Sequence, residues 1–102
     1  HDNDTTRGWY ASLSLKQRLN VVRLMPNSIF MCKSEALIRS AQASRARIVV
    51  IPMQDYLGLG SEARMNLPST TFGNWEWRAT EAQLSPALCG HIHRLCAGRV
   101  EE

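Results

Sequence analysis

Long apolar runs are missing from this sequence of 102 residues. The longest one, residues 48–53, is far shorter than the roughly 20 residues that a membrane-spanning helix needs, so we expect no membrane partner. Internal repeats and low-complexity tracts are missing as well. The apolar fraction of 44% and the charged fraction of 21% are ordinary for globular proteins, which argues against an intrinsically disordered chain. The length leaves room for one domain with a small core.

Cysteine is scarce and its count is odd: the three residues are Cys32, Cys89 and Cys96. An odd number without regular spacing excludes a complete disulfide framework and favours reduced thiols. We therefore expect a cytoplasmic location, or a plastid if the source is a plant or an alga.

The histidines and cysteines near the C-terminal end suggest a metal site as one interpretation. Cys89, His93 and Cys96 would share one face of a helix, whereas His91 would point elsewhere. Structural zinc normally takes four ligands, often in closely spaced pairs, and three ligands on one helix do not supply them. The sequence therefore predicts no metal and no cofactor.

A cluster of basic side chains is also lacking, although the net charge is +3. Ten of the twelve basic residues are arginines, and they are scattered along the whole chain. Proteins that bind nucleic acids gather such side chains on one face. Arg45 and Arg47 are close together, but they lead into an apolar segment. We therefore expect no nucleic-acid partner.

Hydrophobic periodicity predicts a helix in the first quarter of the chain. Leu15, Leu19 and Val22 recur at the spacing of one helical face, which predicts a helix over residues 13–24. Pro26 would end it, because proline disfavours helical backbone in the residue before it.

Two further helices are predicted from their capping residues. One is expected over residues 35–43, with Ser34 as its N-cap. The other is expected over residues 86–97, where Ser85 would be the N-cap and Gly98 would suit the C-terminal end.

A short β-branched segment, residues 48–51, is apolar at every position. Such a run is typical of a parallel strand that is covered on both faces, and Pro52 would end its ladder. A single parallel strand cannot form a sheet, so we expect an α/β fold whose other strands lie outside these residues. Gln54 and Asp55 would then follow the carboxyl end of the strand, where the active sites of barrel enzymes lie.

The first six residues, HDNDTT, concentrate carboxylates, hydroxyls, an amide and an imidazole. Free chain ends tend to fray, so such dense polar chemistry is unusual there. Two interpretations are open from the residues alone: a solvated tail, or a reactive site at which the chain was cut from a longer protein. We expect the second.

Three stretches together resemble the 4-α-glucanotransferases, the amylomaltase or disproportionating enzymes of glycoside hydrolase family 77. They are HDNDTTRGW at residues 1–9, IPMQDYLGLGSEARMN at residues 51–66 and GNWEWR at residues 73–78. The resemblance extends over residues 1–99 and implies the C-terminal part of a TIM (β/α)8 barrel with inserted subdomains. Residues 1–102 would then belong to one catalytic domain without an internal boundary, beginning after barrel strand 7 and including strand 8 and the final helix.

The resemblance also implies an activity. Enzymes of this family transfer α-1,4-glucan segments to another glucan or to glucose by a retaining mechanism with an oxocarbenium-like transition state. The implied partners are α-1,4-glucans, maltooligosaccharides and glucose. The alternative is a non-catalytic, stand-alone carbohydrate-binding or interaction module derived from the barrel.

The resemblance assigns catalytic roles to the first two residues. Asp2 would be a third carboxylate that stabilises the transition state, and His1 would help to hold the same sugar. The nucleophile and the general acid/base would lie upstream on earlier strands, so the isolated chain is expected to be inactive.

Four further residues are candidates for substrate binding. Asn66 would contact a donor-side sugar, while Arg64 would bind substrate or have a structural role. Gln54 and Asp55 would either touch sugar or orient their neighbours. Trp75 and Trp77 offer apolar faces on which sugars stack, or they pack the last helix onto the barrel.

Overall fold

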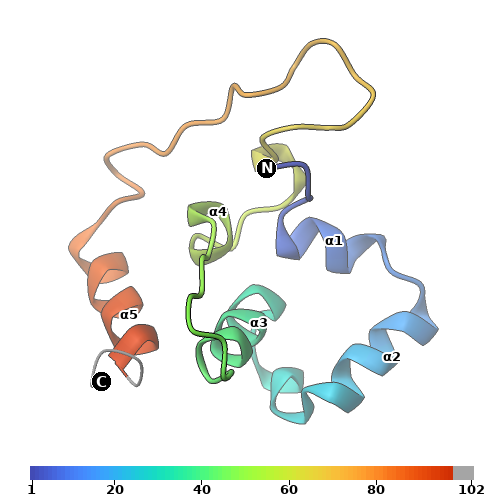
Figure 1. Cartoon of the computed structure of the whole chain (residues 1–102), viewed down its shortest axis with the longest axis vertical. Coiled ribbons are helices and arrows are strands. Elements are labelled where there is room, and N and C mark those ends of the chain that lie inside the picture. Colours follow the sequence, from blue (N-terminus) through green and yellow to red (C-terminus); the bar gives the residue numbers. More distant parts are fainter. Residues whose placement is uncertain (98–102) are drawn as a thin grey trace.

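Seven helical segments make up the regular structure of residues 1–97, which are the residues that the computed structural model describes (Figure 1). The α-helices and the 3-10 helices, labelled η, are α1 (Thr6–Ser12), α2 (Leu15–Leu24), η1 (Pro26–Phe30), α3 (Lys33–Gln42), α4 (Met53–Tyr56), η2 (Ser61–Ala63) and α5 (Pro86–Cys96). The three predicted helices are confirmed as α2, α3 and α5. Helices α1 and α4 were not predicted.

The helix starts explain why the predicted boundaries are close for α2 and α5. The Ser14 hydroxyl accepts from the backbone N–H of Gln17, and the Gln17 side chain accepts from the backbone of Ser14, so a capping box fixes the start of α2. The Ser85 hydroxyl accepts from the N–H of Leu88, as predicted for α5. Gly98 lies outside the described residues.

The predicted N-cap of α3 is wrong. The helix begins at Lys33, after Cys32, and the carbonyl of Cys32 already accepts the first helical hydrogen bond, from Ala36. Ser34 therefore lies inside the first turn. Its side chain is buried, and its hydroxyl has no hydrogen-bond partner among the described residues.

The predicted strand over residues 48–51 is also wrong. These residues form no strand and no ladder within residues 1–97. Ile48 is 78% exposed and Val50 is 83% exposed. The physical reason is that a strand exists only with a partner backbone, and no described segment supplies one. Pro52, expected at the end of a ladder, is instead the N-cap of α4.

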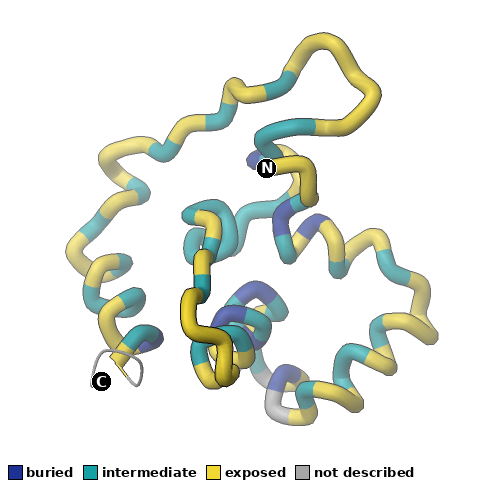
Figure 2. The backbone as a smooth tube through the Cα atoms, in the orientation of Figure 1, coloured by how far each residue is buried: buried dark blue, intermediate teal, exposed yellow. Residues whose placement is uncertain are grey.

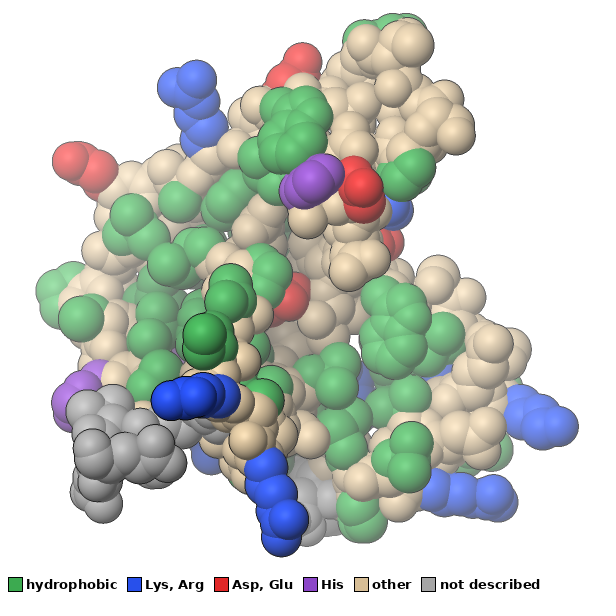
Figure 3. All heavy atoms as spheres, in the orientation of Figure 1, with side chains coloured by type: hydrophobic (Ala, Val, Ile, Leu, Met, Phe, Trp, Pro, Cys, Tyr) green, Lys and Arg blue, Asp and Glu red, His purple; other side chains and the backbone are tan. Residues whose placement is uncertain are grey.

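A small core forms around α3, which contacts α1, α4, α5 and η1 (Figures 1 and 2). Ala36 and Ile38 of α3 are buried there, together with Leu95 of α5. Ala63 is buried as well, in η2, which contacts α1. Helix α2 has no buried residue, and several large apolar side chains stay in contact with solvent. Hydrophobic side chains accordingly spread over the face seen in Figure 3.

The chain after η2 has little regular structure. Residues 64–85 form turns, bends and irregular backbone that lead around the molecule to α5, which returns to contact α3 (Figure 1). Among the described residues, no helix combines the length and the apolar character required to cross a bilayer.

Candidate functional site

The N-terminal residues are joined to α4 by the side chain of Asp55. Its Oδ1 accepts a hydrogen bond of 2.8 Å from the backbone N–H of Thr6, and its Oδ2 accepts one of 2.9 Å from the Thr6 hydroxyl. Thr5 is the N-cap of α1, and its hydroxyl accepts from the N–H of Gly8. Two side chains therefore satisfy free amides at the start of α1, and one of them lies 49 positions away in the sequence.

Gly8 allows η2 to approach the first turn of α1. The hydroxyl of Ser61 donates a hydrogen bond of 2.8 Å to Oδ2 of Asp4, directly beside the backbone of Gly8. A Cβ atom at Gly8 would collide with the Ser61 hydroxyl and the Asp4 carboxylate. Only glycine therefore fits this contact without displacement.

Asp2 is held by the segment that follows η2. Asn66 donates a hydrogen bond of 2.7 Å from Nδ2 to Oδ1 of Asp2, and Arg64 donates one of 2.6 Å from Nη2 to the Asp2 carbonyl. Arg64 also donates through Nε to the carbonyl of Asn66, at 2.8 Å. The Nε2 atom of His1 lies 3.1 Å from Oδ1 of Asp2. Four predicted site residues thus meet at one place.

The Asp2 carboxylate remains open to a ligand on one side. Its side chain is 59% exposed, and that of His1 is 60% exposed. Oδ1 faces Asn66 and His1, whereas Oδ2 accepts no hydrogen bond from any of residues 1–97. This oxygen can therefore accept hydrogen bonds from hydroxyl groups of a bound molecule.

Trp75 adds a contact that the sequence did not predict. Its ring lies against the ring of His1, with centroids 4.8 Å apart and planes tilted by 42°. Its φ angle is +61°, a left-handed conformation that costs a bulky residue about 1–2 kcal/mol. Its N–H donates a hydrogen bond of 2.6 Å to the carbonyl of Met65. No spacing rule connects residue 75 to residue 1, so no sequence signal could have found this pair.

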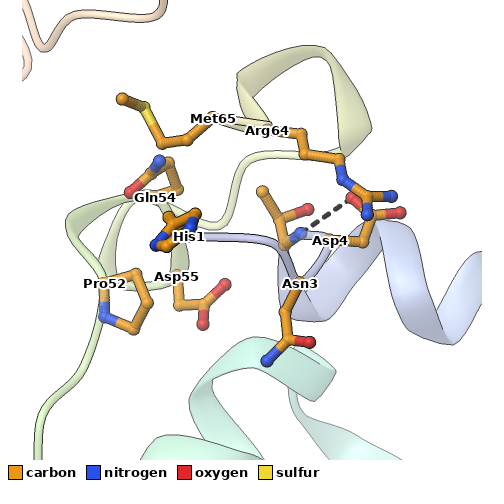
Figure 4. Close-up of a pocket in the computed structure, with 9 residues that line it drawn as sticks. His1, Asn3, Asp4, Pro52, Gln54, Asp55, Arg64 and Met65 are labelled. Carbon is orange, nitrogen blue, oxygen red and sulfur yellow. Dashed lines mark hydrogen bonds between the residues drawn. The ribbon is translucent and has the colours of Figure 1, made fainter. Parts of the chain in front are cut away.

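A hollow of about 200 Å³ lies beside these residues (Figure 4). Figure 4 shows that its walls come from the N-terminal segment, from α4 and from the chain after η2. It is lined by His1, Asn3, Asp4, Thr5, Pro52, Gln54, Asp55, Arg64 and Met65. The lining carries imidazole, amide, carboxylate and guanidinium groups, which suit a ligand rich in hydroxyls.

Gln54 and Asp55 both line this hollow and both have protein partners. Nε2 of Gln54 donates a hydrogen bond of 3.2 Å to the carbonyl of Ala63, and Asp55 binds Thr6 through both oxygens. These contacts orient η2 and α1. Substrate binding by either side chain stays a prediction.

A second polar cluster joins α3, α4 and α5 away from the hollow. Nε2 of Gln42 lies 3.4 Å from the Tyr56 hydroxyl and 3.4 Å from the sulfur of Cys96. Burial raises the pKa of Tyr56 above its ordinary value of 10.0, and the hydrogen bond and the charge of Cys96 raise that pKa further. This cluster links α5 to α3 and α4 through side-chain hydrogen bonds.

The candidate zinc ligands of α5 do not come together with others. Nε2 of His91 lies 3.5 Å from Oε1 of Glu35, while Cys89 is exposed. Within residues 1–97, no three side chains of His, Cys, Asp or Glu are placed to hold a metal ion.

Comparison with known proteins places these residues in a single family. The model of the 4-alpha-glucanotransferase family, glycoside hydrolase family 77, matches residues 1–84. The chloroplastic/amyloplastic 4-alpha-glucanotransferase of Solanum tuberosum is 53% identical over 78 residues, which are 76% of this chain and 14% of that protein. The 4-alpha-glucanotransferase of Thermus thermophilus is 42% identical over 91 residues, 84% of this chain and 18% of that protein.

A solved structure agrees with the sequence comparison. The amylomaltase from Streptococcus agalactiae in complex with acarbose superposes with a TM-score of 0.87 at 27% sequence identity. The superposition covers 93% of this chain and 19% of that one. The chain thus corresponds to between 14% and 19% of the length of these three proteins.

Proposed function

The chain belongs to the 4-alpha-glucanotransferase family, and on that premise we propose that it forms the C-terminal part of the catalytic (β/α)8 barrel of such an enzyme. The superposition on an amylomaltase supports this proposal. The segment of residues 48–51 also supports it, because it has the β-branched, apolar composition of a barrel strand, and Ile48 and Val50 are exposed where neighbouring strands would cover them. In the complete barrel it would be strand 8.

The proposed reaction moves a segment of an α-1,4-glucan to a second glucan or to glucose. In a retaining mechanism, an enzyme carboxylate replaces the leaving sugar at the anomeric carbon, and the acceptor hydroxyl then displaces the carboxylate. Both steps pass through a transition state with positive charge on the sugar ring. A fixed carboxylate close to that ring stabilises it.

The observation that carries the proposal is the way in which Asp2 is held. Oδ1 faces Asn66 and His1, and Oδ2, which accepts no hydrogen bond from residues 1–97, can accept from sugar hydroxyls. Hydrogen bonds of this kind strengthen as the sugar distorts, and they contribute several kcal/mol (about 2–4) to the transition state. His1, next to the same carboxylate, is placed to hold the same sugar.

The other candidate residues receive supporting roles in this proposal. Arg64 bridges the carbonyls of Asp2 and Asn66, so it fixes the two backbone segments to each other. Gln54 and Asp55 orient η2 and α1 around the hollow. The direct sugar contacts would then come from Asp2, His1 and Asn66.

The nucleophile and the general acid/base are proposed to lie in the part of the enzyme that precedes these residues. The two carboxylates that line the hollow, Asp4 and Asp55, already accept hydrogen bonds from Ser61 and Thr6. These hydrogen bonds favour a structural role for both Asp4 and Asp55. The cellular compartment is also proposed. The relative from Solanum tuberosum is named as chloroplastic/amyloplastic, and we propose a plastid location if the source is a plant or an alga.

The test is the substitution Asp2→Asn in the complete enzyme. We expect kcat for the disproportionation of maltotriose to fall about 10²- to 10³-fold, as when one group that stabilises transition-state charge is removed. Acarbose binding, measured by calorimetry, should be largely retained. Glu81→Gln, an exposed carboxylate outside the site, is the matched control. An unchanged turnover would remove Asp2 from the mechanism, and a complete protein that binds glucans without transferring them would favour the binding module.

A further inference from the structure

Trp75 and His1 form the one ring–ring contact among the described residues, and Asp2 also lies beside the imidazole. The ring centroids are 4.8 Å apart. The imidazole therefore has two neighbours, the ring of Trp75 and Oδ1 of Asp2, which lies 3.1 Å from Nε2. The His1 side chain is 60% exposed, so few other contacts restrict its rotation.

Trp75 lies beside His1 with its backbone in an unfavourable conformation. A φ of +61° is rare for a bulky side chain, and such outliers persist where the surrounding structure enforces them. Here the N–H of Trp75 is fixed by its hydrogen bond of 2.6 Å to the carbonyl of Met65. Met65 stands between Arg64 and Asn66, the two residues that hold Asp2.

The loop between Asn66 and Trp75 is closed by its own hydrogen bonds. The Oδ1 of Asn74 accepts from the N–H of Leu67 at 2.8 Å, and its Nδ2 donates to the Thr70 hydroxyl at 2.9 Å. That hydroxyl donates in turn to the carbonyl of Leu67 at 2.6 Å. Both ends of the loop are thus tied together beside Asp2, and Trp75 stands at its exit.

We infer that Trp75 is a positioning residue that holds the His1 imidazole against Asp2, in a role that rests on the proposed function. An aromatic ring against one face of the imidazole restricts its rotation without taking a hydrogen bond from it. Nε2 therefore stays beside the carboxylate before the sugar enters. Trp75 itself need not touch the substrate.

Kinetics of single variants test the role of the ring. In the complete enzyme, Trp75→Ala should lower kcat for maltotriose about 10- to 100-fold with KM little changed, because a misplaced group costs rate rather than binding. Trp75→Phe keeps a ring and should recover much of kcat. Phe72→Ala, in the same loop and 88% exposed, should leave kcat unchanged. A raised KM with normal kcat would overturn the inference in favour of direct sugar stacking.

Trp75→Gly separates the side chain from its backbone. Glycine accepts a positive φ readily, so this variant should be at least as heat-stable as Trp75→Ala. Its kcat should nevertheless be as low as that of Trp75→Ala, because both lack the ring. A Trp75→Gly enzyme with normal kcat would show that the ring is not needed and would overturn the inference.

A double-mutant cycle tests whether Trp75 acts through His1. If it does, the double variant His1→Ala/Trp75→Ala should have the same kcat as His1→Ala alone. If the losses of kcat caused by His1→Ala and by Trp75→Ala multiply in the double variant, the inference is overturned. The Cε1–H resonance of His1, assigned with His1→Ala, gives a readout that does not need activity: Trp75→Ala should move it, and Phe72→Ala should not. A resonance that stays in place would refute the contact, whereas a wild-type enzyme without transfer activity would refute the proposed function.

Discussion

Asn66 donates a hydrogen bond of 2.7 Å to the carboxylate of Asp2, across 64 positions of sequence. Asp2 is exposed, so this single side-chain bond, together with the His1 contact, decides where its carboxylate points. The backbone of both residues is fixed by Arg64, which donates to both carbonyls. The orientation of Asp2 thus depends on a loop that is remote in the sequence.

Substitution of Asn66 should therefore impair the enzyme through Asp2. We expect Asn66→Ala in the complete enzyme to lose about 10- to 100-fold in kcat/KM, since a hydrogen bond to a charged group contributes about 1.5–3 kcal/mol. Asn66→Asp should be worse, because it places a second negative charge beside Asp2. The measurement is steady-state transfer from maltotriose. Asn20→Ala on the exposed surface of α2 is the control, and equal activity of all three variants would contradict the role of Asn66.

Two glycines should respond in opposite directions to the same substitution. Gly8→Ala forces a Cβ into the Ser61 hydroxyl and the Asp4 carboxylate, and overpacking of this kind costs about 1–3 kcal/mol. Among the described residues, a Cβ at Gly90, inside α5, meets the flexible tip of Arg94 at 3.4 Å, so Gly90→Ala should stabilise the helix by about 1 kcal/mol. Thermal unfolding of the complete enzyme checks both. A lower midpoint for Gly90→Ala, or an unchanged one for Gly8→Ala, would contradict this packing.

The raised pKa of Tyr56 predicts a loss of stability in alkali. The folded state keeps the phenol proton to a higher pH than the unfolded state does, whose pKa is near the ordinary 10.0. The stabilising contribution is therefore complete below pH 10.0 and is lost as the pH rises through the folded pKa. Thermal midpoints measured across this range should fall more steeply for the wild type than for Tyr56→Phe.

Cys96 supplies the matched control for Tyr56. Burial is the largest cause of the raised pKa, and the hydrogen bond and charge of Cys96 add to it. Cys96→Ser cannot form a thiolate, so the pKa of Tyr56 should decrease while burial still holds it above 10.0. Difference absorbance of the phenolate, with Tyr56→Phe as the blank, measures this pKa. A higher pKa in Cys96→Ser would contradict the assignment.

Local signals explain which helices could be predicted from the sequence. The start of α2 depends on Ser14 and Gln17, and that of α5 depends on Ser85, all within one turn of the helix that they cap. Helix α1 was missed because it carries no apolar stripe and buries only Gly8. Its start is stabilised by Asp55, which no local pattern connects to it.

Contacts between residues that are distant in the sequence explain which predictions were wrong and which features could not be predicted. A β-branched run such as residues 48–51 indicates a strand, but the strand forms only where a partner backbone is present. The site has the same dependence: Asp2, Arg64 and Asn66 were singled out through family resemblance, since no spacing rule joins residues 2 and 66. The contact between His1 and Trp75 requires a left-handed backbone at a tryptophan, which sequence propensity disfavours.

The exposed pair Ile48 and Val50 yields the last prediction, which concerns the proposed eighth strand. Isolated residues 1–102 should aggregate, because these side chains are 78% and 83% exposed and their backbone pairs with no strand within residues 1–97. The double substitution Ile48→Lys/Val50→Lys should reduce that aggregation, measured by light scattering. In the complete enzyme the same change should abolish folding, since it would bury two lysines inside a barrel at a cost of several kcal/mol each. Phe72→Lys, at an 88% exposed loop position, should leave the complete enzyme folded. A soluble, active enzyme with Ile48→Lys/Val50→Lys would show that this segment is not a covered strand, because a covered strand has no room for two unpaired ammonium groups.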